Sequence, residues 1–117
     1  MNAVQVTDLH LDSDAQMLRV RFGDGVVAAL PVELLRVESP SAEVQGHGPG
    51  ERQLVAGKSL VRLIGIEPVG NYAVRLVFDD GHDTGIFSWA WLRRLHDEQD
   101  ALWAGYLAAL AAAGRRR

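Results

Sequence analysis

The sequence predicts an α+β domain that combines antiparallel β-hairpins with short helices and a C-terminal amphipathic helix. Three observations predict this class. Short segments alternate between apolar and polar residues and are separated by Asp-Gly turns, as in antiparallel hairpins. The order of hairpin and short helix occurs twice along the chain. The 117 residues, 48% of them hydrophobic, are enough for one core, so we expect a single domain over residues 1–117, with its core at about 8–95.

The first unit is predicted to contain two turns, three strands and a helix. The polar Asp12-Ser13-Asp14 separates two alternating segments, and the glycines of Gly23-Asp24-Gly25 allow the positive φ that a tight turn needs. Pro31 suits the first position of a helix because that position needs no amide hydrogen. The predicted strands are Val4–His10, Gln16–Phe22 and Val26–Leu30, and the predicted helix is Pro31–Arg36.

The stretch from Glu38 to Lys58 shows neither a strand nor a helix period. It is rich in Ser, Pro and Gly and contains Gly46-His47-Gly48-Pro49-Gly50. We interpret it as one long loop. Loops of about twenty residues in a compact domain are usually functional or disordered.

The second unit repeats the order of the first. Turn-forming residues at Pro68–Asn71 and Asp79–His82 separate segments that are β-branched or alternating. Ser88 is a favourable N-cap for a helix that continues through Leu95. The predicted strands are Ser59–Ile66, Ala73–Phe78 and Thr84–Phe87.

The C-terminal helix is predicted at about 98–113 from its apolar spacing. Asp97 and Asp100 are expected to serve the free amides of its first turn, and Gly114 to end it. We interpret Arg115-Arg116-Arg117 as a solvated end that favours the helix dipole, with a partner-binding role as the alternative. The side expected to be buried carries Leu102, Trp103, Tyr106, Leu107 and Leu110.

The aromatic residues of the last two helices permit two interpretations. Their helical spacing favours packing in the core, and the alternative is a partner groove or a self-association patch. These residues are Trp89, Trp91, Trp103 and Tyr106.

The two halves of the sequence align with each other. Leu18–Gly25 matches Val74–Gly81 at an offset of 56 residues, and Leu34-Leu35-Arg36 matches Trp91-Leu92-Arg93 at an offset of 57. Each half reads strand, Asp-Gly turn, strand and short helix. We therefore expect the apolar faces of two pseudo-repeated units to close on each other as one core.

Composition excludes several functions. The 12 Lys and Arg residues against 15 Asp and Glu residues give a formal charge of −3, which disfavours nucleic acid as a partner. The chain has no cysteine, so it has no disulfide, thiolate metal site or thiol nucleophile. The uncharged stretch Ala101–Gly114 is shorter than the roughly 20 residues that span a bilayer. No membrane association and a cytoplasmic location are expected.

No catalytic or cofactor motif is complete. Gly57-Lys58-Ser59 lacks the preceding glycine and the following helix of a phosphate-binding loop, and no serine lies in a nucleophile elbow. The histidines at 10, 47, 82 and 96 form no pair at helical spacing. His82 and Asp83 are neighbours, whose side chains point to opposite faces of an extended chain. We therefore expect no enzymatic activity and no cofactor.

The most distinctive stretch begins at Glu67-Pro68-Val69-Gly70-Asn71-Tyr72-Ala73-Val74 and continues from Phe78-Asp79-Asp80-Gly81-His82 to Trp89. It resembles the family of small domains named after the N-terminal domain of gamma-butyrobetaine hydroxylase, a domain of unknown function. The likeness covers roughly Asp8 to Leu95 and is strongest in the second half. In the hydroxylase the domain is an accessory to a separate oxygenase domain. Other relatives look like parts appended to iron–sulphur carrier ATPases.

The resemblance implies a zinc site that this sequence has lost. Zinc-bearing members carry three cysteines in the order Cys-x-Cys-x-x-Cys, and the histidine of the Asp-Gly-His turn is the fourth ligand. The matching positions here are Ser39, Ser41 and Val44, while His82 remains. Hydroxyl and isopropyl groups do not replace thiolates as zinc ligands, so we expect no zinc.

Two alternatives for His82 stay open on the sequence. Glu38, Glu43 and His47 lie in the long loop and would have to join His82 as hard ligands for metal to bind. Without metal, either His82 caps its turn or its ring hydrogen-bonds the loop that zinc would otherwise hold. The sequence does not rank these two roles.

The leading functional hypothesis is a non-catalytic accessory module that binds a protein partner, with a link to metal-cofactor or iron–sulphur assembly implied by the resemblance. We expect two turns to converge near the long loop as the binding surface, although the same residues are also ordinary turn formers. The second hypothesis is a small-molecule or metal-binding protein that uses His82 with loop carboxylates. The third is an enzyme whose site is shared across an oligomer. The candidate binding residues are Asn71, Tyr72, Asp80, His82 and Asp83.

Overall fold

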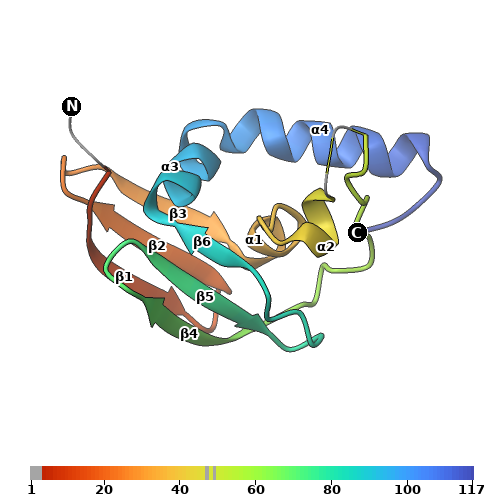
Figure 1. The fold of residues 1–117 in the computed structure, drawn as a ribbon. Helices are drawn as coiled ribbons and strands as arrows, with labels where there is room; N and C mark the ends of the chain where they lie inside the picture. Colours follow the sequence, from red (N-terminus) through yellow and green to blue (C-terminus); the bar gives the residue numbers. More distant parts are fainter. Residues whose placement is uncertain (1–3, 47, 49) are drawn as a thin grey trace.

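Two three-stranded antiparallel sheets and four helices make up the fold, so the predicted α+β class is confirmed (Figure 1). The structure is a computed structural model that describes residues 4–117 except 47 and 49. The strands are β1 (Val6–Asp12), β2 (Met17–Phe22), β3 (Val27–Pro31), β4 (Leu63–Val69), β5 (Ala73–Phe78) and β6 (Ile86–Ser88). The helices are α1 (Val32–Val37), α2 (Ala42–Gln45), α3 (Trp89–Asp97) and α4 (Gln99–Ala112).

The first sheet has the order β1-β2-β3, and the alternation in sequence sets its two faces. Leu18, Val20 and Phe22 of β2 are buried, while the residues between them face solvent. Pro31 is the last residue of β3 and the N-cap of α1, rather than the first helical residue that we predicted. The helix begins one residue later because the proline remains in extended conformation at φ −60°, ψ 140°.

The second sheet has the order β4-β5-β6, and the prediction for its first strand was wrong. We predicted Ser59–Ile66, whereas β4 spans Leu63–Val69. Residues before it form a turn in which the amide of Val61 donates to the carbonyl of Lys58. Pro68 pairs with Val74 inside the strand instead of starting the turn. An edge strand tolerates this proline because one row of its amides needs no partner.

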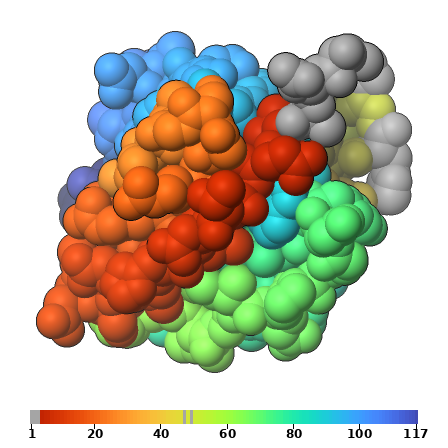
Figure 2. Space-filling model, turned by 90° about the vertical axis from the view of Figure 1, so that its left-hand side faces the viewer, coloured from red at the N-terminus to blue at the C-terminus, as the bar shows by residue number. Residues whose placement is uncertain are grey.

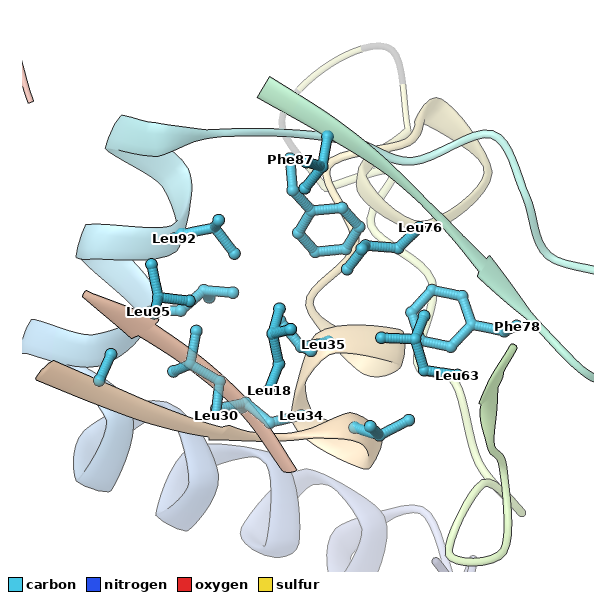
Figure 3. Packing of buried hydrophobic residues seen from close by; sticks show 14 of the residues in the cluster. Leu18, Leu30, Leu34, Leu35, Leu63, Leu76, Phe78, Phe87, Leu92 and Leu95 are labelled. Atoms are coloured by element: carbon cyan, nitrogen blue, oxygen red, sulfur yellow. The ribbon is translucent and has the colours of Figure 1, made fainter. Parts of the chain in front are cut away.

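The core lies between the two sheets and is closed by α1 and α3 (Figure 3). Side chains from both units meet there, so the expected joint core of the repeats is present. Figure 3 shows Leu18 and Leu30 of the first sheet facing Leu76 and Phe87 of the second, with Leu35 of α1 between them. All five side chains are fully buried.

The two units share details below the level of element order. Each has a β-bulge in its first strand, between Val6 and Asp8 in β1 and between Leu63 and Gly65 in β4. Each Asp-Gly turn places its glycine at positive φ, +89° at Gly25 and +91° at Gly81. Within each turn the aspartate accepts the amide two residues later. The turn geometry is therefore repeated along with the sequence.

An exchanged pair of salt bridges joins the two units. Arg36 of α1 binds Asp80 in the turn of the second unit, with Nε and Oδ2 2.8 Å apart. Arg93 of α3 binds Asp24 in the turn of the first unit, with Nη1 and Oδ2 2.9 Å apart. The partners occupy equivalent positions of the two repeats. We call these two contacts the crossed ion pairs.

The crossed ion pairs differ in burial. The side chains of Arg36 and Asp80 are 11% and 17% exposed, whereas those of Arg93 and Asp24 are 24% and 54% exposed. Nη1 of Arg36 is also buried and has no hydrogen-bond partner within the described part of the chain. Breaking the Arg36–Asp80 pair should therefore cost more stability, because a buried charge that loses its partner is not compensated by water.

The start of α4 differs from the prediction. Asp97 is the last residue of α3 and binds Arg93, while Glu98 precedes α4 without a side-chain cap bond. The carboxylate of Asp97 is used within α3 and not by α4. Leu107, expected on the buried side, is 39% exposed, whereas Tyr106 and Leu110 are buried. The helix therefore buries a narrower face against the domain than its apolar spacing predicted.

The side chains of Arg115 and Arg117 are bound to the domain, unlike the solvated end that we predicted. Arg117 donates three hydrogen bonds to the buried carboxylate of Glu33 and lies over the Trp103 ring. Arg115 donates to the carbonyl of Leu54. These contacts fix the tail to α1 and to the segment before β4.

The aromatic residues of the last two helices pack against the core, as their helical spacing predicted. Trp89, Trp91 and Trp103 are partly buried against core side chains, and Tyr106 is buried with Leu110. The polar atoms of Trp89, Trp91 and Tyr106 are satisfied, because each donates to a backbone carbonyl. The Trp89, Trp91 and Tyr106 bonds reach Asn71, Glu38 and Val55 respectively.

Candidate functional site

The first half of the predicted long loop is folded against the second unit. It contains the short helix α2, with Ser41 as N-cap accepting the amide of Glu43 at 3.2 Å. Glu38, Ser39 and Val44 are buried. The single-loop prediction over Glu38–Lys58 was therefore wrong in this part. Its Ser and Gly residues favoured the loop prediction, whereas contacts with the second unit order this segment.

A hydrogen-bond network joins α2 to the Asp-Gly turn of the second unit. Nε2 of His82 lies 2.9 Å from Oγ of Ser39, and Nδ1 lies 3.0 Å from Oε2 of Glu43. Thr84 donates to the other oxygen of Glu43 at 3.1 Å and contacts Oγ of Ser41 at 2.7 Å. His82 is 4% exposed. We call these five residues the His82 network.

Gly85 provides the space for this network. A Cβ atom at position 85 would lie 2.5 Å from Oγ of Ser39, closer than such contacts allow. A side chain there would push Ser39 away from His82. The close approach of the two segments thus depends on a glycine that sequence reasoning did not single out.

Of the two roles left open for His82, the structure shows the second, in which the ring hydrogen-bonds the loop. Its imidazole bonds the segment at the start of the predicted loop, through Ser39 and Glu43. Its backbone also takes part in the turn, because its carbonyl accepts the amide of Phe78. The ring contact is the one that joins two distant parts of the chain.

Charges around the turn set the protonation of His82 and Asp80. Burial lowers the pKa of His82, nearby Arg36 lowers it further, and Glu43 and Asp80 raise it only in part. The imidazole is therefore neutral at pH 7. For Asp80, burial raises the pKa, but bonds from Lys58, the amide of His82 and Arg36 outweigh burial and lower it to about 2. Asp80 is the fixed negative charge of this region.

The low pKa of Asp80 predicts a pH-dependent stability. A carboxylate whose pKa is lower in the folded state stabilises the fold above its unfolded pKa and loses that effect as pH falls. The lowering from 3.8 to about 2 corresponds to roughly 2 kcal/mol at neutral pH. We expect the stability difference between the wild type and Asp80→Asn in urea unfolding to shrink between about pH 5 and pH 2. A difference that stays constant over this range would contradict the assignment.

The loop carboxylates do not assemble with His82 as a ligand set. No group of three or more His, Asp or Glu side chains suited to a metal ion occurs in the part of the chain that the structure describes. Glu43 reaches His82, but Glu38 turns the other way and binds Arg52 at 2.5 Å. His47, the remaining candidate, lies outside the described residues.

The five predicted binding residues do not form one surface. Asp80, His82 and Asp83 follow β5, whereas Asn71 and Tyr72 precede it, so the two groups lie at opposite ends of this strand. The expected convergence of the two turns does not occur, because consecutive turns of a meander alternate between the ends of its strands. Asp80 is held in ion pairs and His82 is buried, while Asp83 faces solvent beside Arg75.

A hollow lies beside the other turn. It has a volume of about 350 Å³ and runs between β1 and the β4–β5 hairpin. Figure 2 looks onto β1, in red, and shows the surface hollowed between this strand and the green hairpin. The lining is mainly apolar and consists of Val6, Thr7, Asp8, Leu9, Pro68, Gly70, Ala73, Val74 and Trp89.

Tyr72 lies in the turn between Gly70 and Ala73, which are two of the residues that line this hollow. Its side chain is 57% exposed, and its ring packs close to Gly70, where a Cβ atom would be 2.9 Å from the ring. Trp89 fixes the turn through two bonds, from its amide to the carbonyl of Tyr72 and from its indole to that of Asn71. The predicted residues Asn71 and Tyr72 are thus presented on a rigid turn.

The sequence model of the family described as gamma-butyrobetaine hydroxylase-like, N-terminal matches residues 9–93. The chain belongs to this family. The match begins within β1 and ends within α3, so it includes the whole His82 network and the part of the hollow's lining from Leu9 to Trp89. No curated protein gives a significant match. Every described helix of this family member is too short or too polar to cross a membrane.

Solved structures have the same fold. Two proteins studied by NMR in solution are 47% and 50% identical to this family member, each with a TM-score of 0.85. The matches cover 99% of this chain and 91% and 86% of those chains. A crystal structure of a protein of unknown function, of the DUF971 family from Acidithiobacillus ferrooxidans, is 40% identical with a TM-score of 0.67. That match covers 79% of this chain and 92% of the other.

Sequence reasoning missed the role of two members of the His82 network and the glycine that gives the network its space. Thr84 was assigned to a strand, Glu43 was considered only as a metal ligand, and Gly85 was not considered. The alignment of the repeats contained a usable signal. His82 matches Val26 of the first unit, so the imidazole is an addition to the common turn and must have a contact that the first unit lacks.

Proposed function

We propose that this chain is a non-catalytic, cytoplasmic accessory module that binds a protein partner through the hollow between β1 and the β4–β5 hairpin. The observation that carries the proposal is a mainly apolar hollow with an exposed tyrosine in the adjoining β4–β5 turn. Tyrosine is enriched at protein interfaces because it combines a large apolar ring with a polar end.

The strands beside the hollow support a protein as the ligand. β1 and β4 are edge strands of their sheets, and edge strands offer backbone groups to an extended peptide. The hollow contains a single carboxylate, Asp8, and no histidine, serine or cysteine. Such a lining suits side-chain packing and provides no group for catalysis.

The His82 network supports a structural role for the residues that resemble a metal site. Both ring nitrogens of His82 are engaged, and Glu43 is held by Thr84 as well. A buried, fully bonded imidazole is not positioned to act on a substrate. The alternative, a metal-binding protein, rests on the His82–Glu43 pair at 3.0 Å.

The resemblance names the first partner to test. Because some relatives look like parts appended to iron–sulphur carrier ATPases, we propose such an ATPase as the partner and metal-cofactor assembly as the setting. Nucleic acid is not proposed as a partner, since the formal charge is −3.

We expect Tyr72→Ala to weaken partner binding by at least about 2 kcal/mol, or roughly 30-fold, as removal of an interface tyrosine does. The measurement is calorimetric titration of the purified ATPase, preceded by quantitative pull-down with wild-type and variant baits. Leu60→Ala is the matched control, because Leu60 is 88% exposed but lines a different cavity. A Tyr72→Ala bait that captures the same proteins in the same amounts as the wild type would refute the proposal.

A further inference from the structure

The outer side of α4 carries no charge, which is unusual for a helix at the surface. From Ala101 to Gly114 the sequence contains no Asp, Glu, Lys or Arg. Figure 1 shows that the rest of the domain lies on one side of α4, and only Tyr106 and Leu110 of this helix are buried. A helix packed on one side usually places charged residues on the other.

A seam of residues follows the part of α4 that faces away from the domain. Ala104, Leu107 and Ala111 are spaced at three and four residues, as in the contact positions of a coiled coil. All three are exposed, with Leu107 at 39%. Asp100 lies four residues before Ala104 and continues the seam toward the start of the helix. The seam is apolar in the middle and acidic at one end.

The two ends of the helix have opposite charges. Asp100 stands in the first turn, and Arg115 and Arg116 follow the last. In the described part of the chain the side chains of Asp100 and Arg116 have no hydrogen-bond or ion-pair partner, whereas Arg117 is bound to Glu33. Charges that are free at both ends of an apolar seam can pair with a second helix that runs the opposite way.

We propose that α4 packs antiparallel against α4 of a second copy of this chain, about a two-fold axis near Leu107. Ala104 of one copy then faces Ala111 of the other, and Asp100 faces Arg115 and Arg116. The same contacts occur twice because the interface is isologous. A parallel arrangement would bring like charges together at both ends, and the charge pattern opposes it. This surface is separate from the hollow beside Tyr72, so the inference stands independently of the proposed function.

The interface is small. A helix of this length spans about 21 Å, and the area that one such pair buries is at the lower end of specific interfaces. We therefore expect a dimer with a Kd in the micromolar range or weaker, on the order of the weakest specific complexes. Sedimentation velocity should show a coefficient that rises with protein concentration.

Cysteine cross-linking tests the arrangement directly, since the wild-type chain contains no cysteine. Ala104→Cys and Ala111→Cys are prepared as separate full-length variants. An antiparallel pair brings position 104 of one copy to position 111 of the other, while two copies of position 104 lie about 10 Å apart along the axis. Oxidation of the mixed variants should give a disulfide dimer, and oxidation of either variant alone should not.

The control and the opposing results are clear. Ser13→Cys, at an exposed turn far from α4 in sequence, reports non-specific cross-linking, and circular dichroism confirms that each variant is folded. Cross-linking of each variant with itself would establish a parallel pair and overturn the proposal. Mixed samples that cross-link no more than Ser13→Cys would also overturn it.

Charge reversal provides a second readout that leaves the seam intact. Asp100→Arg should weaken dimerisation at least about tenfold, and the double variant Asp100→Arg with Arg116→Asp should restore it. Asp14→Arg is the matched control at an exposed site outside α4. If Asp100→Arg sediments like the wild type at every concentration, the end-to-end charge pairing is refuted.

Discussion

A chain with Ser39, Ser41 and Val44 all replaced by cysteine should bind one zinc ion together with His82. Oγ of Ser39 is already 2.9 Å from Nε2 of His82, and the amide of Ser41 donates to the same oxygen. Val44 is buried in the short helix that Ser41 begins. Three thiolates and an imidazole are a complete tetrahedral ligand set for zinc. We therefore expect three thiolates at these positions to lie near enough to His82 to share one zinc ion.

The expected effect is large because zinc binds only the folded state. At a zinc concentration one hundred times the Kd, the free energy of unfolding rises by about 2.7 kcal/mol. Thermal unfolding with and without zinc measures it, and metal analysis after gel filtration gives the stoichiometry. A variant with only two of the three cysteines is the control. The wild type should show no shift with Zn²⁺ or Fe²⁺, which also tests the metal-binding alternative built on His82 and Glu43.

Two results would contradict this prediction. If the triple variant elutes without zinc, the segment around α2 does not hold the three side chains toward His82. If the wild type itself gains stability with micromolar metal, the His82 network binds metal without cysteine ligands.

Arg36→Ala should destabilise the fold by about 2 to 3 kcal/mol, the second large effect. Removing one member of a buried pair leaves the other charge without compensation. Asp80 would lose the bond from Arg36, at 2.8 Å, and would depend on Lys58, whose Nζ lies 2.7 Å from the same carboxylate oxygen. The neutral imidazole of His82 would not replace the guanidinium. Equilibrium urea unfolding at pH 7 measures the change.

Arg93→Ala is the matched control, because Arg93 occupies the equivalent position of the other repeat. Its partner Asp24 is 54% exposed, and exposed ion pairs contribute only a small amount to stability. The contact of its guanidinium with the Phe22 ring at 5.0 Å adds to that amount without changing the order. Equal losses in the two variants would mean that burial does not distinguish the crossed ion pairs.

Local pattern was sufficient to predict most of the fold. Alternation and Asp-Gly turns located the hairpins, and Ser88 located the start of α3, where its Oγ accepts the amide of Trp91. The errors lie where tertiary contacts override local preference. Pro68 stays in a strand because β4 is at an edge, and α2 is stabilised by the second unit rather than by its own four residues.

The candidate site could be predicted only in part. The absence of cysteine and the presence of His82 were visible in sequence, and Tyr72 was proposed from it as a binding residue. The positions of these residues relative to one another were not, since Tyr72 and His82 lie at opposite ends of β5. The bond from Glu43 to His82 spans 39 residues, a separation at which no spacing rule applies.

The crossed ion pairs require two repeats, either in one chain or in two associated copies. The helix arginine of each repeat binds the turn aspartate of the other repeat. A single repeat therefore cannot form this ion pair within itself. Two separate copies would make it twice, identically. In the present chain the two contacts are no longer equivalent, because the Arg36–Asp80 pair is enclosed beside His82 and the Arg93–Asp24 pair is exposed to water.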